Sequence, residues 1–164
     1  MKRVVIVRHA KSVPYGYEDD FNRNLTERGE EDAAKIISKL QQCGIKADVM
    51  ISSPAKRALE TAHIFAQSLV FDKKEIIEVK DLYDGMTTSQ FIKLINDLPE
   101  SAESAFFFGH NPDLNNFADN LLRDFGRDMP TCSTLVINFD VTRWKDVGAR
   151  KGEIGFHFIP QMFR

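Results

Sequence analysis

The sequence contains little cysteine. Its 164 residues include two, Cys43 and Cys132. Neither has the spacing of a metal site or of a disulfide framework. We therefore interpret both thiols as reduced and expect no metal bound by them.

A long hydrophobic run is also lacking near the first residue. Met1-Lys2-Arg3 is followed by only four apolar residues, Val4 to Val7, before Arg8. Such a run is too short for the core of a signal peptide or for a membrane span. The sequence therefore predicts no membrane partner, and a cytoplasmic location is the expectation that follows.

No charge of one sign dominates. Lys and Arg number 22 and Asp and Glu number 24, which gives a net charge of -2. This balance offers no global attraction for nucleic acid or anionic lipid, although it is compatible with a local anion site. A hydrophobic content of 43% over 164 residues suffices for one sizeable core. Without an internal repeat or a linker, the chain is predicted to be a single domain over residues 1–164.

Short apolar runs alternate with helical periodicities along the chain. The apolar runs predict strands at residues 4–7, 49–51, 76–79, 105–108, 135–139 and 155–159. Helices are predicted after Thr26, after Ser53 with Pro54 as the first residue, at about 89–97, and from Asn111 and Pro112. This alternation predicts an α/β fold, a three-layer α/β/α sandwich with a mostly parallel central sheet. The last two strands are expected to form a hairpin.

Polar segments with basic and imidazole side chains follow three predicted strands. They are Arg8-His9-Ala10-Lys11-Ser12, Ser53-Pro54-Ala55-Lys56-Arg57 and Gly109-His110-Asn111-Pro112. Ligands of parallel sheets bind at the carboxyl ends of the strands. We therefore expect His9, Arg57 and His110 to meet at one edge of the sheet.

These residue types suit a phosphoryl group, which carries about two negative charges at neutral pH. The guanidinium groups of Arg8 and Arg57 match phosphate oxygens, and the N-termini of the predicted helices would add backbone donors. An imidazole whose reactive nitrogen is unprotonated can attack phosphorus. His9 is the predicted nucleophile, and His110 is predicted to be a charged hydrogen-bond donor to the phosphoryl oxygens.

Each of these residues also has a structural interpretation. A lone histidine is more often a packed polar side chain, and Arg57 alone would be a solvated helix residue; the joint placement at strand ends favours function. His63 and His157 lack suitable partners in sequence and are expected to be structural. Asp19 and Asp20 could be a metal pair, but no further ligand spacing supports a cluster, so a solvated loop is expected. The sequence predicts no metal and no cofactor.

Other phosphate chemistries lack their motifs. There is no Gly-x-x-x-x-Gly-Lys-Ser/Thr segment for a nucleotide-binding loop and no Asp-x-Asp pair for an aspartyl-phosphate enzyme. A thiol phosphatase needs an arginine six positions after its cysteine, whereas Cys43 leads to Val49 and Cys132 leads to Asn138. Phosphoryl transfer to a histidine is the mechanism that remains.

Several motifs together resemble the histidine phosphatase superfamily, which is phosphoglycerate-mutase-like, and in particular its small SixA-like phosphohistidine phosphatase branch. They occur in the order of that branch: Arg8-His9, Leu25-Thr26-Glu27-Arg28-Gly29, Ser52-Ser53-Pro54 with Arg57-Ala58 and Thr61-Ala62, Gly109-His110-Asn111-Pro112, Pro130-Thr131, and Trp144 with Pro160. The resemblance implies a phosphoglycerate-mutase-like fold. It also implies that His9 accepts the phosphoryl group and that Arg8, Arg57 and His110 form the phosphate pocket.

The resemblance assigns roles to three further residues. Ser12 matches a position where several members carry a hydroxyl near the phosphate; the alternative is a serine that caps the loop. Arg23 stands in Arg23-Asn24-Leu25, where the small branch commonly has Arg-Pro-Leu, and would contact the substrate at the rim. Asp84 stands where mutases have a proton-donating acid, and its alternative is an ordinary Asp-Gly turn.

The chain lacks the insertions that build a substrate cap in mutases, and a pocket with little cap suits a bulky substrate. The resemblance therefore implies a metal-independent phosphatase whose phosphate-bearing partner is a protein with phosphohistidine. Two alternatives stay open at this point. The chain could be a broad phosphomonoesterase for small metabolites, or a non-catalytic module that binds phosphorylated partners.

Overall fold

A six-stranded sheet forms the centre of the protein in a computed structural model that describes residues 1–14, 16 and 19–164. The strands are β1 (Lys2–Arg8), β2 (Val49–Ser52), β3 (Ile77–Glu78), β4 (Ser104–Gly109), β5 (Thr134–Phe139) and β6 (Glu153–Phe158). Their order is β3-β2-β4-β1-β5-β6. The first four are parallel, and β5 and β6 are antiparallel to their neighbours. The mostly parallel sheet and the closing hairpin are confirmed.

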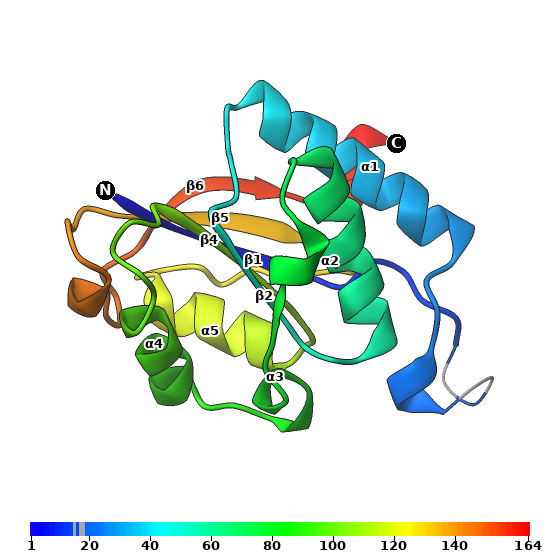
Figure 1. Cartoon of the computed structure of the whole chain (residues 1–164), viewed down its shortest axis with the longest axis horizontal. Coiled ribbons are helices and arrows are strands. Elements are labelled where there is room, and N and C mark those ends of the chain that lie inside the picture. Colours follow the sequence, from blue (N-terminus) through cyan, green and yellow to red (C-terminus); the bar gives the residue numbers. More distant parts are fainter. Residues whose placement is uncertain (15, 17–18) are drawn as a thin grey trace.

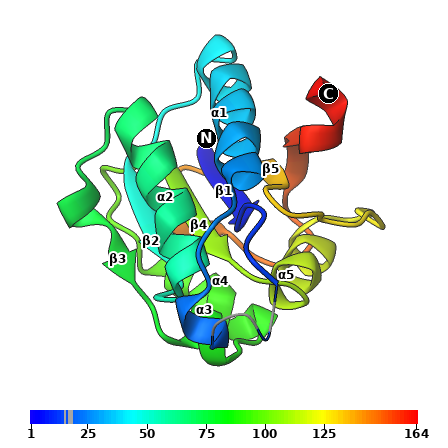
Figure 2. The ribbon, with the colours of Figure 1, turned by 90° about the vertical axis from the view of Figure 1, so that its right-hand side faces the viewer.

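Helices cover both faces of this sheet (Figures 1 and 2). On one face lie α1 (Glu27–Gln42) and α2 (Lys56–Ser68), and on the other lie α4 (Thr88–Asn96) and α5 (Asp113–Leu121), with the short α3 (Asp81–Asp84) near them. Short 3-10 helices are η1 (Asp20–Asn22), η2 (Lys73–Glu75), η3 (Trp144–Asp146) and η4 (Pro160–Phe163). The predicted three-layer α/β/α architecture is confirmed. No helix in the described part of the chain is long and apolar enough to span a bilayer.

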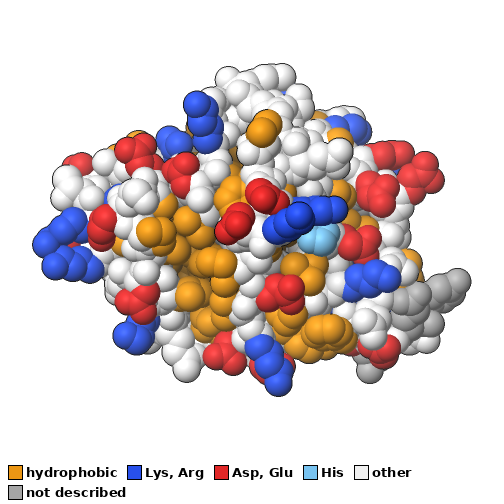
Figure 3. Space-filling view, viewed as in Figure 1, with side chains coloured by type: hydrophobic (Ala, Val, Ile, Leu, Met, Phe, Trp, Pro, Cys, Tyr) orange, Lys and Arg blue, Asp and Glu red, His pale blue; other side chains and the backbone are white. Residues whose placement is uncertain are grey.

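The buried β1 strand explains why the sheet needs cover on both faces. Successive side chains of a strand point to opposite faces, and all four residues from Val4 to Val7 are 0% exposed. Val4 and Ile6 belong to the apolar cluster with α4 and α5, whereas Val5 and Val7 belong to the cluster with α1 and α2. In contrast to the apolar side chains of β1, charged side chains of both signs are spread over the surface of the protein (Figure 3).

The start of α1 fixes the loop that follows β1. The side chain of Thr26 caps the helix by accepting a hydrogen bond from Gly29 N, as its sequence position predicts. Thr26 N also donates to Lys11 O at 2.9 Å. A Cβ atom on residue 29 would collide with Lys11 O, so glycine lets the loop approach the helix closely. This contact holds the chain just beyond His9.

The start of α2 differs from the prediction. Ser53 and Pro54 are not its cap and first residue, because α2 begins at Lys56 and its N-cap, Ala55, makes no side-chain cap bond. Ser53 Oγ instead accepts a hydrogen bond from Ala55 N at 3.1 Å and lies 2.8 Å from His110 Nε2. A serine hydroxyl that bonds the backbone two residues on favours a turn over a helix.

Other element boundaries differ by a few residues. Pro112 is the N-cap of α5 rather than its first residue, and the predicted cap Asn111 accepts from Asn115 N at 3.2 Å. β3 contains only Ile77 and Glu78, both exposed, because it pairs with β2 over two residues at the edge of the sheet. The segment from Lys11 to Asn24, which joins β1 to α1, falls partly outside the described residues.

Candidate active site

The carboxyl ends of three neighbouring strands bring the predicted residues together. His9 N donates to Gly109 O at 3.0 Å, so the β1–β4 pairing extends one residue beyond the end of β1. Ser53 N donates to Phe108 O at 2.9 Å in the same way on the β2 side. The rings of His9 and His110 consequently lie with their centroids 5.3 Å apart. The expected meeting of these strand ends at one edge is confirmed.

The surroundings of His9 fix where its proton lies. His9 is 6% exposed, and its Nδ1 lies 2.8 Å from Ala10 O. A carbonyl oxygen only accepts, so Nδ1 carries the hydrogen and Nε2 keeps its lone pair in the neutral ring. Burial, with His110, Arg57 and Arg8 nearby, lowers the pKa of His9 to about 3 and outweighs the bond to Ala10 O, which acts to raise it. His9 therefore presents an unprotonated nitrogen at neutral pH.

His110 is held by Ser53. Ser53 Oγ accepts from Ala55 N and lies 2.8 Å from His110 Nε2, so one hydrogen bond joins the hydroxyl to the imidazole. Burial and then the charge of Arg57 lower the pKa of His110 to about 4. The ring is thus neutral in the free site. The charged His110 expected from the sequence requires a bound anion to raise this pKa.

Among the residues that the structure describes, four buried side-chain nitrogens at this site have no hydrogen-bond partner: Arg8 Nε, Arg23 Nε, Arg57 Nε and His110 Nδ1. Leaving a buried polar group unpaired costs about 1–3 kcal/mol, so such groups are uncommon. All four belong to residues that the sequence assigned to substrate binding, and three of them carry positive charge. A ligand with several anionic oxygens would satisfy them.

The terminal nitrogens of the two central arginines are bonded to other parts of the chain. Arg8 Nη1 donates to Met129 O at 3.0 Å. Arg57 Nη1 donates to Asp20 O at 2.6 Å, and Arg57 Nη2 donates to Asp20 Oδ2 at 3.2 Å. These bonds hold the guanidinium planes, and the buried Nε groups make no hydrogen bond with the described residues.

Asp20 is a site residue that the sequence reasoning missed. Its carboxylate accepts from Arg57, from Arg23 Nη2 at 2.9 Å and from the hydroxyl of Tyr83 at 2.8 Å. The interpretation of Asp19 and Asp20 as a solvated loop is therefore wrong for Asp20, although Asp19 does cap η1. A usable signal was the spacing of three between Asp20 and Arg23, which suits an ion pair within one turn.

The ionisation of Asp20 follows from these partners. Burial acts to raise its pKa, but the hydrogen bond from Tyr83 and the charges of Arg57 and Arg23 outweigh burial, so the pKa lies below its ordinary value. The same bond raises the pKa of Tyr83, which keeps its proton. Asp20 is accordingly a carboxylate at neutral pH.

Ser12 and Arg23 lie together, but Asp84 is not joined to them. Arg23 Nη1 donates to Ser12 Oγ at 3.3 Å, which agrees with the loop interpretation of Ser12 and leaves a phosphate contact untested. Asp84 lies at the end of α3 with its side chain 47% exposed, and its Oδ2 is 3.8 Å from Lys80 Nζ. The role of Asp84 as proton donor stays a prediction.

No group of three or more His, Cys, Asp or Glu side chains within the described ranges has an arrangement that could hold a metal ion. The site's positive charge comes from arginine, and its hydrogen-bond donors are guanidinium and imidazole nitrogens. Donors of this kind suit an anion rather than a cation.

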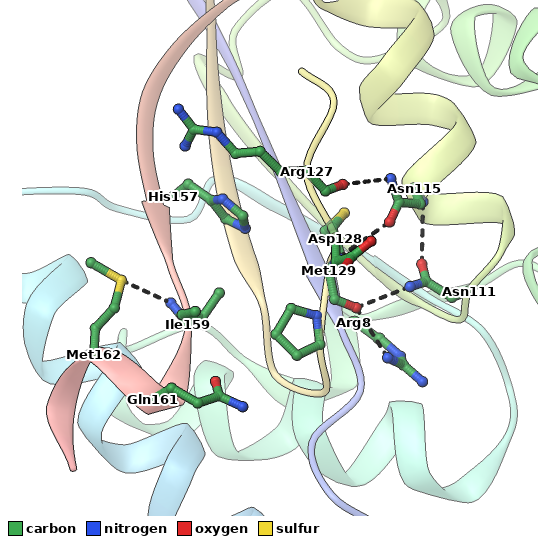
Figure 4. A pocket seen from close by; sticks show the side chains of 11 residues that line it. Arg8, Asn111, Asn115, Arg127, Asp128, Met129, His157, Ile159, Gln161 and Met162 are labelled. Atoms are coloured by element: carbon green, nitrogen blue, oxygen red, sulfur yellow. Dashed lines mark hydrogen bonds between the residues drawn. The ribbon is translucent and has the colours of Figure 1, made fainter.

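A cavity of about 820 Å³ adjoins the site at Arg8 (Figure 4). It lies between the start of α5, residues 127–130 and the end of β6, and its wall includes His157 and Met162. Asn115 fixes part of the wall, since its Nδ2 donates to Arg127 O at 3.0 Å. His9, Arg57 and His110 do not line this cavity, whereas Arg8 and Asn111, the neighbour of His110, do.

A family model described as histidine phosphatase superfamily (branch 1) matches residues 4–119. Among curated proteins, serine/threonine-protein phosphatase Pgam5, mitochondrial, of Drosophila ananassae is 33% identical over 84 residues, which are 51% of this chain and 29% of the relative. Its counterpart in Drosophila erecta is 24% identical over 166 residues, with coverage of 93% and 57%. The chain therefore spans only part of the length of these relatives.

Solved structures agree on the fold. A SixA protein from Agrobacterium tumefaciens has a TM-score of 0.80 at 22% identity, and the match covers 97% of this chain and 98% of that one. The protein histidine phosphatase SixA complexed with tungstate has a TM-score of 0.81 at 17% identity, with 99% of each chain covered. Identities this low speak for the fold alone, and the predicted phosphoglycerate-mutase-like fold of the SixA type is confirmed.

Proposed function

The chain belongs to the histidine phosphatase superfamily, and from this premise we propose that it hydrolyses phosphohistidine in proteins through a covalent phosphohistidine on His9. One observation carries the proposal: His9 Nδ1 lies 2.8 Å from Ala10 O, which leaves Nε2 with its lone pair in a buried pocket. Nucleophilic catalysis by histidine needs such a nitrogen.

In the first step the phosphoryl group binds among the free nitrogens of Arg8, Arg57 and His110. His9 Nε2 forms a bond to phosphorus as the bond to the leaving group breaks, and the electron pair of that bond goes to the leaving atom. The guanidinium groups and the His110 imidazole stabilise the charge on the transferring oxygens.

In the second step a water oxygen bonds to phosphorus and the phosphorus–nitrogen bond of His9 breaks. The electron pair returns to His9 Nε2, one proton of the water passes to solvent, and inorganic phosphate leaves. The bond between Nδ1 and Ala10 O keeps the ring in one tautomer through both steps, so His9 is restored ready for the next cycle.

The leaving group supports phosphohistidine as the substrate class. Imidazole has a reference pKa of about 6.5, whereas an alkoxide resembles hydroxide, whose parent water has a pKa of about 15.7. Ester cleavage therefore needs a proton donor much more. Asp20, which contacts Arg57, is ionised and holds no proton to donate.

A second candidate function is a phosphomonoesterase for small metabolites. The cavity of about 820 Å³ beside Arg8 favours it. Ligand pockets for small molecules are typically about 300–1,000 Å³. In that case the metabolite would extend from the phosphate pocket past Arg8, and a separate acid such as Asp84 would protonate the alcohol.

The two candidates differ in which substrates turn over efficiently. We expect a phosphohistidine peptide to show a higher kcat/KM than sugar phosphates, nucleotide monophosphates or p-nitrophenyl phosphate. The variant His9→Ala tests whether the measured turnover depends on the nucleophile. Its matched control is His63→Ala, because His63 is exposed on α2. Equal or better turnover of a sugar or nucleotide phosphate would favour the second candidate.

A further inference from the structure

Three side chains meet beside the phosphate pocket, and we call Asp20, Phe21 and Tyr83 the rim. The Tyr83 hydroxyl donates to Asp20 Oδ2 at 2.8 Å, and the Phe21 ring meets the Tyr83 ring edge-on with centroids 5.2 Å apart. Tyr83 also lies edge-on to His110 at 5.6 Å, and Asp20 is bonded to Arg57. The rim thus touches both an imidazole and a guanidinium of the pocket.

The rim is accessible to a ligand. The Asp20 side chain is 32% exposed and Phe21 is 40% exposed. On the face shown in Figure 3, hydrophobic side chains gather near α3, next to acidic and basic ones. A carboxylate beside accessible aromatic rings can bind a planar cation, through the charge of the carboxylate and the electron-rich ring faces.

Charge balance in the pocket points to the same class of ligand. Arg8, Arg23 and Arg57 are cations, Asp20 is an anion, and His9 and His110 are neutral in the free site. The three guanidinium charges and the one carboxylate charge sum to two positive charges. A phosphoryl group with about two negative charges matches this sum. A second acidic group on the substrate would find no further cation among these residues. Asp20 already pairs with Arg23 and Arg57, and its side chain, which is 32% exposed, is a carboxylate that a cationic group of the substrate would meet.

We propose that the rim selects substrates whose leaving group is a cationic nitrogen base, above all the protonated imidazole of phosphohistidine. The inference rests on the proposed function, because it assumes phosphoryl transfer to His9. It adds a selective role for Asp20, Phe21 and Tyr83, which neither the family motifs nor the phosphate pocket assigns.

The chemistry balances without a separate acid. One ring nitrogen of the substrate carries phosphorus, and the other carries a proton that points to Asp20. When His9 Nε2 bonds to phosphorus, the phosphorus–nitrogen bond of the substrate breaks and its electron pair neutralises the ring, which leaves as imidazole. A carboxylate beside the ring raises the fraction that is protonated, and the protonated ring is the better leaving group.

The test compares two small phosphoryl donors with good leaving groups of opposite charge. Phosphoimidazole releases a base that is cationic when protonated, and acetyl phosphate releases an anion. The measured quantity is the ratio of their kcat/KM values, because a change that acts through Arg57 affects both donors and cancels.

The variants are Asp20→Asn and Phe21→Leu, with Asp19→Asn as the matched control, since Asp19 caps η1 through Asn22. We expect the ratio of phosphoimidazole to acetyl phosphate to fall roughly fivefold in each rim variant, the size of one exposed ion pair or cation–π contact. The control should keep the ratio of the unmodified protein.

An unchanged ratio in Asp20→Asn, or an equal fall in Asp19→Asn, would overturn the inference. Thermal unfolding of each variant establishes that it is folded. Phosphoryl labelling of His9 by acetyl phosphate separates this failure from failure of the proposed function. If the label forms while the ratio does not move, the rim is not selective but the phosphatase chemistry stands.

Discussion

The imidazole rings of His9 and His110 lie with their centroids 5.3 Å apart and their planes inclined by 50°. Burial and nearby arginine charges hold the pKa of His9 at about 3 and that of His110 at about 4. Two neutral imidazoles can share a pocket that two imidazolium ions could not. The nucleophile is therefore ready before the substrate binds, and the arginines supply the positive charge.

Arg57 and His110 are expected to stabilise the transferring phosphoryl group. We predict that Arg57→Ala and His110→Ala each lower kcat by roughly 10²–10³, the effect of removing one such donor. Lys56→Ala is the matched control, because Lys56 is the exposed neighbour of Arg57 on α2. Steady-state kinetics and the thermal shift produced by vanadate are the measurements. If vanadate raised the unfolding temperature of the unmodified protein and of both variants equally, the phosphate pocket would be wrongly assigned.

The lowered histidine pKa values predict that acid destabilises the fold. Between about pH 6.5 and pH 4 an unfolded chain protonates these imidazoles, whereas folded His9 and His110 stay neutral. The unfolded state then binds more protons, so the free energy of unfolding falls as the pH falls through this window. The pKa of Asp20 is also lowered, so protonation of this carboxylate at lower pH reduces the free energy of unfolding further.

Urea unfolding at several pH values tests this. The double variant His9→Gln, His110→Gln should show a flatter pH dependence than the unmodified protein. His63→Gln, which changes an exposed histidine of α2, should keep the original slope. If the double variant and the unmodified protein lost stability in parallel, the lowered pKa values would be wrong.

Activity is expected to survive a chelator. The positive charge that the reaction needs is supplied by Arg8 and Arg57, and the free donors are nitrogen atoms. We predict equal turnover before and after prolonged treatment with EDTA, measured in metal-free buffer. Loss of activity that magnesium or zinc restores would contradict this.

Asp84 is expected to matter for esters more than for phosphohistidine. If it leaves its ion pair with Lys80 and protonates the leaving oxygen, Asp84→Asn should slow phosphomonoester hydrolysis by roughly a hundred-fold or more. Phosphohistidine cleavage should fall much less, because imidazole is the better leaving group.

Single-turnover phosphorylation of His9 by each donor isolates the step in which Asp84 would act. Asp81→Asn, in the first turn of the same short helix, is the matched control. Equal slowing with both donors would refute the leaving-group argument. No slowing with either would return Asp84 to the role of a turn residue.

Local signals in the sequence were enough to predict much of the fold. The apolar run from Val4 to Val7 and the cap at Thr26 act within a few residues, so β1 and the start of α1 follow from them. The meeting of His9 and His110 follows from parallel strands that end at one edge. The predicted start of α2 was wrong because Ser53 contacts His110, which follows a strand that is distant in the sequence.

Contacts between distant segments account for what the sequence could not predict. Asp20 meets Arg57 across 37 residues and Tyr83 across 63, and neither separation has a periodicity that indicates contact. The tautomers of His9 and His110 depend on single oxygen atoms whose positions only the folded chain defines. The single-domain organisation, the cytoplasmic location and the independence from metal stay predictions.

The central claim is that His9 accepts the phosphoryl group. The most direct measurement is mass spectrometry of the full chain, quenched in alkali within milliseconds of mixing with a phosphohistidine peptide. We predict an acid-labile phosphoryl group on His9 that forms and decays at the rate of turnover. In folded His9→Ala the label should be absent and turnover should fall on the order of a million-fold. A label on another residue, no label during turnover, or appreciable activity of His9→Ala would contradict the account.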